Sequence, residues 1–249
     1  MLFNCLQKVS LMKILHVISS FPPAYSYGGA LKIAYDYSQA LSNLGNDVTV
    51  YTTDVKDLNS RFEIKENPQW IEDVEVYRFK NLSNHLATKN LPIAPSLASD
   101  LKKNIKNFDI IHLHEYRSFQ AFAVSYYSKK NSIPYVLQPH GSAKVILEKQ
   151  NLKNMFDKLC GETIIRNSCK LIAVSNVELS QLDKLKPNNT VVISNAMNTS
   201  DYANLPKKGN FKDKYGLPHN EKLILYLGRI HKIKGLNNLI MAFDEYSRQ

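Results

Sequence analysis

The sequence predicts an α/β protein: a doubly wound, mostly parallel Rossmann-like sheet, followed by the first strand–helix unit of a second Rossmann-like domain. Three observations predict it. Short apolar segments alternate with amphipathic helices along the chain. Several of these segments are continuous apolar runs, as in strands that helices cover on both faces. The composition, with 44% hydrophobic and 22% charged residues among 249, is that of a globular protein.

The apolar segments define the sheet of the first domain. Helical stretches separate most of them, and a strand–helix–strand connection makes the two strands parallel. His16 is expected to be buried within the first strand. The predicted strands are Ile14–Ile18, Val48–Thr52, Val74–Phe79, Ile110–His114, Tyr135–Gln138, Leu171–Val174 and Val191–Ile193.

Helical spacing of apolar residues is clearest over residues 30–44, where Gly45 supplies a stop. Further helices are expected over 118–130 and 176–185, and one or two within 145–168. The stretch 80–97, which contains Pro92 and Pro95, is expected to be an irregular loop.

An acid-poor stretch carries Leu97, Leu101 and Ile105 at helical spacing, with lysines around them. Two interpretations stay open. This apolar face packs on the sheet, which we favour, or it lies on an anionic membrane surface.

Changes in composition divide the chain. Residues 1–11 are expected to be an extension, because Met12 stands directly before the first strand. Residues 12–195 form the first Rossmann-like domain, and the Pro-, Gly- and Lys-rich residues 196–220 form a connector. Residues 221–249, with a strand at Leu223–Leu227 and one helix, are expected to be the incomplete start of a second domain.

Charge and cysteine content limit the partners and the compartment. Lys and Arg number 32 against 22 Asp and Glu, which gives a net charge of +10 and an affinity for anions. Nucleic acid is not expected, because only six of these residues are Arg, the residue on which base recognition depends most. The three cysteines include no C-x-x-C pair, which favours a cytoplasmic protein without a zinc site.

Two glycine-containing motifs each stand between a strand and a helix. Gly28 and Gly29 would let backbone N–H groups and the positive end of a helix approach an anion. In the second motif, Gly228 to Gly235, Arg229 could clamp a phosphate with two hydrogen bonds and Lys234 could add a point charge. A flexible loop and a basic surface turn are the alternative interpretations.

Taken in order, these and other motifs resemble the retaining GT-B glycosyltransferases of family 4, over residues 12 to 249. The other stretches that carry the resemblance are the first strand from Met12 to Val17, Asp109 to His114, Pro139-His140-Gly141-Ser142 and Ile172 to Ser175. The resemblance implies two Rossmann-like domains around a cleft, with a nucleotide-sugar donor, a glycan or lipid-linked acceptor and no cofactor or metal. Residues 12–195 would be the acceptor-side domain. Residues 221–249 would be the incomplete start of the donor-binding domain, which predicts no transferase activity for this chain alone.

The resemblance also implies roles for particular residues. Arg229 and Lys234 match the basic pair on the donor diphosphate, and Gly28 and Gly29 match the glycine loop that closes over the donor. His140 matches the cleft histidine beside the transferred sugar and is the predicted catalytic residue.

Residues at the end of one strand are candidates for the acceptor side. His112 and His114 point the same way from their strand, and the resemblance places His114, with Glu115 after it, at the acceptor end. A metal pair is the alternative interpretation, but the sequence shows no third ligand with sensible spacing and no D-x-D triplet.

This chain also departs from the family pattern. The paired glutamates E-x7-E lie beyond the chain, and of the usual Pro-Asn-Gly-Val/Ile-Asp segment only Asn195 matches.

The resemblance as a whole predicts a transferase that acts in polysaccharide or glycolipid synthesis, with peripheral contact at the inner membrane face left open. The alternatives are a nucleotide-sugar 2-epimerase of the same fold and a non-catalytic fragment that binds acceptor or membrane.

Overall fold

A computed structural model describes residues 11–142 and 154–248, apart from six single residues and the segment 231–233. The single residues are Leu58, Asn90, Lys186, Asn188, Asn198 and Arg229. The chain divides into two compact units, Met1–Asn198 and Thr199–Gln249, and each is described by itself.

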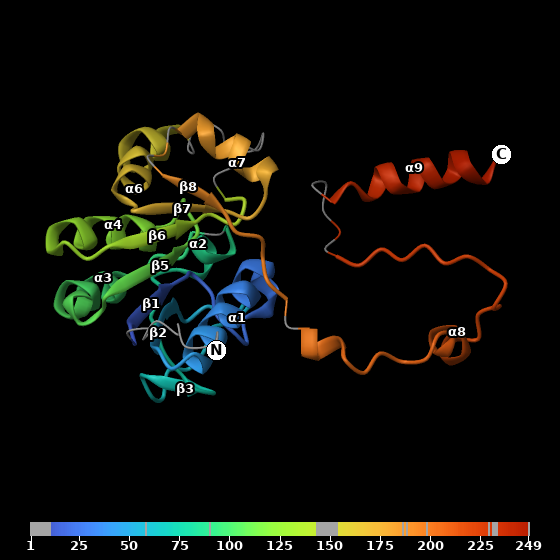
Figure 1. Cartoon of the computed structure of the whole chain (residues 1–249), viewed down its shortest axis with the longest axis horizontal. Helices are drawn as coiled ribbons and strands as arrows, with labels where there is room; N and C mark the ends of the chain where they lie inside the picture. Colours follow the sequence, from blue (N-terminus) through green and yellow to red (C-terminus); the bar gives the residue numbers. More distant parts are fainter. Residues whose placement is uncertain are drawn as a thin grey trace, which may run out of the picture. The chain divides into compact units, whose positions relative to one another are not determined.

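The first unit is built on an eight-stranded sheet with the order β3-β4-β2-β1-β5-β6-β7-β8 (Figure 1). Every neighbouring pair is parallel except β3 and β4. The mostly parallel sheet predicted from the sequence is therefore confirmed. The strands are β1 (Lys13–Val17), β2 (Asp47–Thr53), β3 (Gln69–Ile71), β4 (Val74–Phe79), β5 (Ile110–His114), β6 (Tyr135–Gln138), β7 (Lys170–Ala173) and β8 (Thr190–Val192).

The antiparallel edge strand β3 was not predicted. It has three residues, and Trp70 at its centre is exposed. A strand this short and this open to solvent carries no apolar pattern, and its pairing with β4 depends on the tight turn in which Glu72 has a φ of 52°.

Six α-helices surround this sheet within the described part of the first unit: α1 (Gly29–Asn43), α2 (Asn84–Thr88), α3 (Pro95–Asn104), α4 (Phe119–Asn131), α6 (Glu162–Asn167) and α7 (Asn176–Leu182). The irregular loop expected over 80–97 is wrong in part, because α2 and the first turn of α3 lie within it. The Ser83 side chain caps α2 by accepting a hydrogen bond from the N–H of Leu86, and Pro95 occupies the first turn of α3, where a missing N–H costs nothing.

Two apolar clusters lie on opposite faces of the sheet. Alternate residues of a strand point to opposite faces, so Leu15 of β1 packs in the cluster that contains α3, α4 and α6, while Ile18, just after β1, packs in the cluster that contains α1. The sheet is thus covered on both sides, which explains why its central strands are continuous apolar runs.

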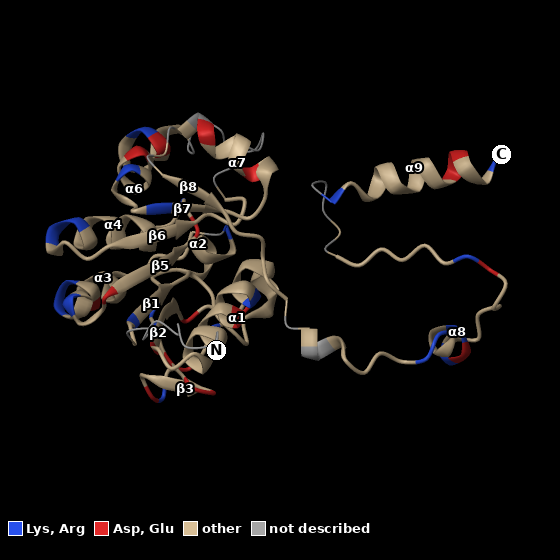
Figure 2. Ribbon diagram, viewed as in Figure 1, with Lys and Arg blue, Asp and Glu red and all other residues tan. Residues whose placement is uncertain are grey.

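The apolar face of α3 belongs to the first of these clusters. Leu97, Leu101 and Ile105 are all fully buried, whereas Lys102 and Lys103 are exposed. This confirms that the face packs on the sheet and excludes it as a membrane-binding surface. The lysines lie at the ends of α3 and α4 (Figure 2).

The second unit contains α8 (Asn210–Tyr215) and α9 (Leu236–Ser247). The helix predicted after Gly235 is therefore present. The strand predicted at Leu223–Leu227 is not: the described part of this unit forms no strand there, and four of the five residues are exposed. A strand is held by hydrogen bonds to a neighbour, so an apolar run alone does not form one. Within the described ranges, no helix has the length and apolar character that crossing a bilayer requires.

The burial of α3 predicts the effect of two adjacent substitutions. Leu101→Ala should lower the free energy of unfolding by about 2–5 kcal/mol, because it leaves a cavity in the core. Lys102→Ala is the matched control and should change it by less than about 0.5 kcal/mol. Urea denaturation of the two variants measures both values, and equal effects would contradict the packing of α3 described here.

Candidate functional site

A depression of about 620 Å³ opens on the first unit where several strands end. In the sheet order, β1 lies between β2 and β5, so the chain reverses direction of winding there. Doubly wound sheets bind ligands at the carboxyl ends of the strands beside this switch point. The depression is lined by Gly29, Ala30, Lys32, Ile33, His140, Gly141, Val174, Ser175, Val177, Glu178, Gln181 and Asn195.

The predicted glycine loop supplies one wall. Gly28 has a φ of 105°, a backbone conformation that favours glycine, and Gly29 begins α1. A side chain at either position would meet nothing within 4 Å, so the backbone here is open. No side chain caps this end of α1, which leaves its first N–H groups and its positive dipole end available to an anion.

His140 supplies the opposite wall from a tight turn after β6. Its φ is 51°, unusual for a residue with a side chain. The turn is closed by Ser142, whose N–H and hydroxyl both donate to the carbonyl of Pro139, at 2.9 and 2.6 Å. The Ser142 hydroxyl in turn accepts from the N–H of Tyr116 at 2.9 Å. These bonds fix the backbone from which the imidazole projects.

Glu178 holds the same turn from the other side and was not predicted. Its carboxylate accepts from the N–H of Gly141 at 2.6 Å and from the N–H of Val174 at 2.8 Å. The motif Ser175-x-x-Glu178 is a capping box, and Ser175 does cap α7 by accepting from the N–H of Glu178. The motif in the sequence indicates the helix cap, but it does not indicate that the Glu178 carboxylate also accepts from the N–H of Gly141.

Two hydrogen bonds connect His140 to the core. Nε2 of His140 lies 2.9 Å from Nδ1 of His114, and Nε2 of His114 lies 2.9 Å from Nδ1 of His16. His16 and His114 are fully buried. His16 is thus buried as predicted, and His112 and His114 point the same way, with ring centroids 4.1 Å apart.

Burial determines the protonation of this cluster. It lowers the pKa of His16 to about 3 and that of His140 to about 4. The pKa values of His112 and His114 are also lowered well below the usual value, by burial and by the neighbouring imidazoles. All four rings are therefore neutral at neutral pH.

The two predicted acceptor-side residues, Glu115 and His114, lie in different environments. Glu115 is half-buried at the end of β5 with a φ of 75°, and its N–H donates to the carbonyl of Gln138 at 3.0 Å. Burial raises the pKa of its carboxyl. His114 is fully buried, so its imidazole meets the cleft through His140 rather than directly. Their role toward an acceptor stays a prediction.

The predicted diphosphate residues belong to the second unit. Lys234 is exposed and directly precedes Gly235, the N-cap of α9. Arg229 lies outside the described residues. Their role toward a donor also stays a prediction.

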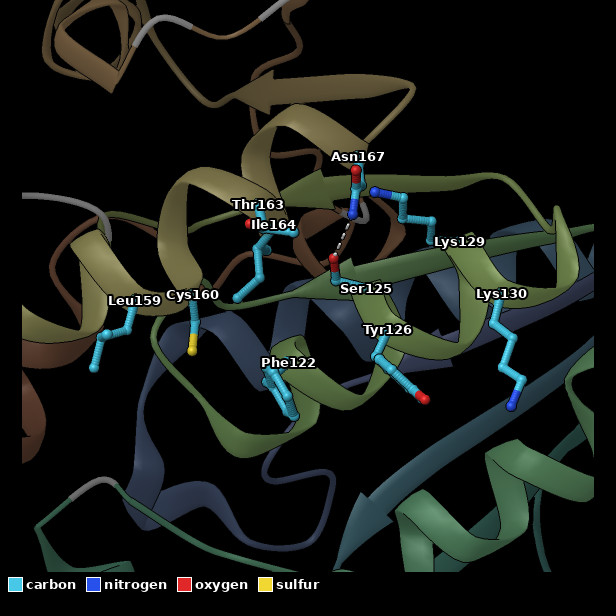
Figure 3. Close-up of a pocket in the computed structure, with 10 residues that line it drawn as sticks. All are labelled: Phe122, Ser125, Tyr126, Lys129, Lys130, Leu159, Cys160, Thr163, Ile164 and Asn167. Atoms are coloured by element: carbon cyan, nitrogen blue, oxygen red, sulfur yellow. Dashed lines mark hydrogen bonds between the residues drawn. The ribbon is translucent and has the colours of Figure 1, made fainter.

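A second pocket, of about 400 Å³, lies between α4 and α6 (Figure 3). Phe122 and Tyr126 of α4 form part of its wall, and Lys129 and Lys130 lie at the end of the same helix. None of the predicted site residues lines it, so it is separate from the depression at the strand ends.

The fold of the first unit and the position of its depression are those of a GT-B type protein. Residues 27–201 match the family model described as Glycosyltransferase Family 4. The chain therefore belongs to this family, as the motifs indicated.

Curated relatives that match the chain are also described as glycosyltransferases. The chain is 22% identical to a D-inositol 3-phosphate glycosyltransferase of Kineococcus radiotolerans, over 99% of this chain and 58% of the relative. It is 25% identical to a putative teichuronic acid biosynthesis glycosyltransferase of Bacillus subtilis, over 94% of this chain and 62% of the relative. The chain thus spans about three fifths of the length of these relatives.

Solved structures share the fold. Sucrose-phosphate synthase of Thermosynechococcus elongatus superposes with a TM-score of 0.69 at 17% identity, covering 94% of this chain and 60% of that one. HepE of Anabaena, solved with UDP and with UDP-glucose, gives TM-scores of 0.56 and 0.55 at 18% and 16% identity, covering 82% of this chain and 50% of that one.

The two bonds to Glu178 predict its contribution to stability. Glu178→Ala leaves the N–H groups of Gly141 and Val174 without their charged acceptor, which should lower the free energy of unfolding by about 3 kcal/mol. Glu178→Gln keeps one carbonyl oxygen and should lose about half as much. Thermal and urea denaturation measure the series, and an alanine variant as stable as the wild type would contradict the role of Glu178.

The lowered histidine pKa values predict a pH dependence. Unfolding restores the ordinary pKa of about 6.5, so the unfolded state binds more protons below that pH, and stability falls as the pH decreases. Each such histidine contributes a slope of about 1.4 kcal/mol per pH unit. His16→Gln should therefore flatten the stability curve between pH 5.5 and 4.5 by about this amount, whereas His85→Gln, at an exposed position, should not. Equal slopes in both variants and the wild type would overturn the assignment of His16 as buried and neutral.

Proposed function

We propose that the protein is a nucleotide-sugar-dependent glycosyltransferase that moves a hexose to a hydroxyl acceptor with retention, in the synthesis of a polysaccharide or glycolipid. The observation that carries this proposal is the depression at the switch point of the sheet, with the Gly28–Gly29 loop on one side and His140 on the other. The UDP and UDP-glucose bound in the structures of HepE support a donor of this chemical class.

The wall formed by α1 suits the anionic part of such a donor. Its first N–H groups and its dipole favour negative charge, and Gly28 and Gly29 carry no side chain that would keep a phosphate away. His140 faces this wall from β6 as a neutral imidazole, which can donate or accept one hydrogen bond to a sugar hydroxyl.

We also assign Arg229 and Lys234, which belong to the second unit, to the donor diphosphate. Negative charge develops on the diphosphate as the bond to the sugar breaks. A guanidinium and an ammonium aimed at that charge stabilise it more in the transition state than in the ground state, which is what accelerates the reaction. Glu115 and the end of β5 are assigned to the acceptor side.

The acceptor itself is assigned only by class. We propose a hydroxyl on a growing glycan or on a lipid-linked sugar at the cytoplasmic side of a membrane. The lysines at the ends of α3 and α4 would allow contact with anionic lipid, since each lysine near such a surface contributes about 1 kcal/mol.

Nucleotide binding tests the proposal. Calorimetric titration with UDP should show binding, and Arg229→Ala should weaken it by about tenfold or more, since a charge-assisted hydrogen bond contributes about 1.5–3 kcal/mol. Lys222→Ala, which removes an exposed lysine of the same unit outside the motif, is the control and should leave the affinity unchanged. An affinity that Arg229→Ala does not change would refute this donor site.

A further inference from the structure

Three imidazoles form a continuous hydrogen-bonded chain from the core of the sheet to the depression at its edge. His16 lies on β1, His114 lies at the end of β5 and His140 follows β6. Both connecting distances, His16 Nδ1 to His114 Nε2 and His114 Nδ1 to His140 Nε2, are 2.9 Å. The chain thus joins a fully buried ring to one that lines the proposed cleft.

The strands keep these rings in place. His16 and His112 are register partners in the parallel pair β1–β5, and His114 stands two residues further along on the same face. The His114 ring is nearly parallel to both, with ring centroids 5.2 Å from His16 and 4.1 Å from His112. Tyr37 of α1 lies over His112, with ring centroids 6.0 Å apart. The strand register therefore sets the positions of these rings.

This arrangement decides which nitrogen of His140 can serve a ligand. Nε2 is already bonded to His114. Nδ1 has no hydrogen-bond partner among the described residues. A ligand in the depression would therefore meet Nδ1 of His140.

The inner end of the chain decides whether this nitrogen donates or accepts. A neutral imidazole carries one proton, so all three rings must carry it on Nδ1 or all three on Nε2 for both hydrogen bonds to form. Nε2 of His16 is buried and has no partner in the part of the chain that the structure describes. Protonation on Nε2 would leave a buried N–H without an acceptor, and such groups are rarer in proteins than unpaired acceptors. The chain therefore favours protonation on Nδ1 throughout.

We propose that His16 and His114 are positioning residues that hold His140 with its proton on Nδ1, so that the cleft receives an N–H donor. The inference rests on the proposed function for its ligand: the hydroxyl and phosphate oxygens of a nucleotide sugar are acceptors that such a donor fits. It assigns a purpose to two histidines that lie too deep to touch that ligand.

The tautomers can be measured directly. Two-bond ¹H–¹⁵N correlation spectra of the protein labelled in its histidines, recorded at pH 7, separate a protonated ring nitrogen from an unprotonated one. We expect Nδ1 to be the protonated nitrogen in His16, His114 and His140. His85 is exposed to solvent and serves as the reference for an imidazole whose tautomer is set by contact with water. A proton on Nε2 of His140 would overturn the proposal.

Two variants at one position test the coupling. His114→Leu removes the donor to Nε2 of His140, so the nitrogen shifts of His140 should move toward those of His85. His114→Gln retains a side-chain N–H that can donate, and His140 should remain protonated on Nδ1. Unchanged His140 shifts in the leucine variant would overturn the coupling. If that variant does not fold, the wild-type and glutamine spectra still decide the proposal.

Two further measurements separate this inference from its rivals. Titration with UDP-glucose tests the proposed function independently: absence of binding would refute that function and leave the tautomer result standing. His16, His112 and His114 also each offer a nitrogen within 4.8 Å of the others, which a metal ion could bind. One equivalent of zinc in the purified protein, lost in His114→Leu, would overturn the hydrogen-bonded chain, because that chain already uses both ring nitrogens of His114.

Discussion

The parallel register between β1 and β5 is the constraint on which the proposed site depends. It pairs His16 with His112. The imidazoles of His16, His112 and His114 thereby lie on the face of the sheet that α1 covers. The opposite faces of the same strands contribute Leu15 and Leu113 to the larger apolar core. A shift of this register by one residue would exchange the two sets, placing histidines in the apolar core and leucines under α1. The core and the site are thus specified by the same pairing.

The same strand pair marks the switch point of the sheet, and the loops that leave its carboxyl edge build the walls of the cleft. Each wall is fixed by bonds from more than one element. Glu178 of α7 holds the turn at Gly141, while Tyr116, after β5, holds it at Ser142. A turn with an unusual φ at His140 persists only because its surroundings determine it in this way. We infer that the rigidity of this turn serves the imidazole it presents.

Much of this fold could be predicted because its strands are buried on both faces. The bounds predicted for β4, β5 and β6 are those observed, since a continuous apolar run with turns at both ends allows little choice. The edge strand β3, with the exposed Trp70 at its centre, has no such pattern. The run at 223–227 has the pattern without a neighbouring strand, and there the prediction failed.

Individual residues of the site could be predicted from the sequence, but the hydrogen bonds that join them could not. Motifs indicated Gly28, Gly29 and His140, and all three lie at the depression or directly before it. The bond between His16 and His114 joins residues 98 positions apart. No local pattern specifies such a bond, because it depends on strand order and register. Glu178 was missed for the same reason, although its capping motif was visible in the sequence.

Binding of a nucleotide sugar in the depression between Gly29 and His140 is tested most directly by backbone amide shifts recorded during titration with UDP-glucose. We expect saturable changes at Gly28, Gly29, Gly141 and Ser175, with none at Phe122 and Tyr126 of the pocket between α4 and α6. Changes confined to the pocket between α4 and α6, or no changes at saturating ligand, would contradict it.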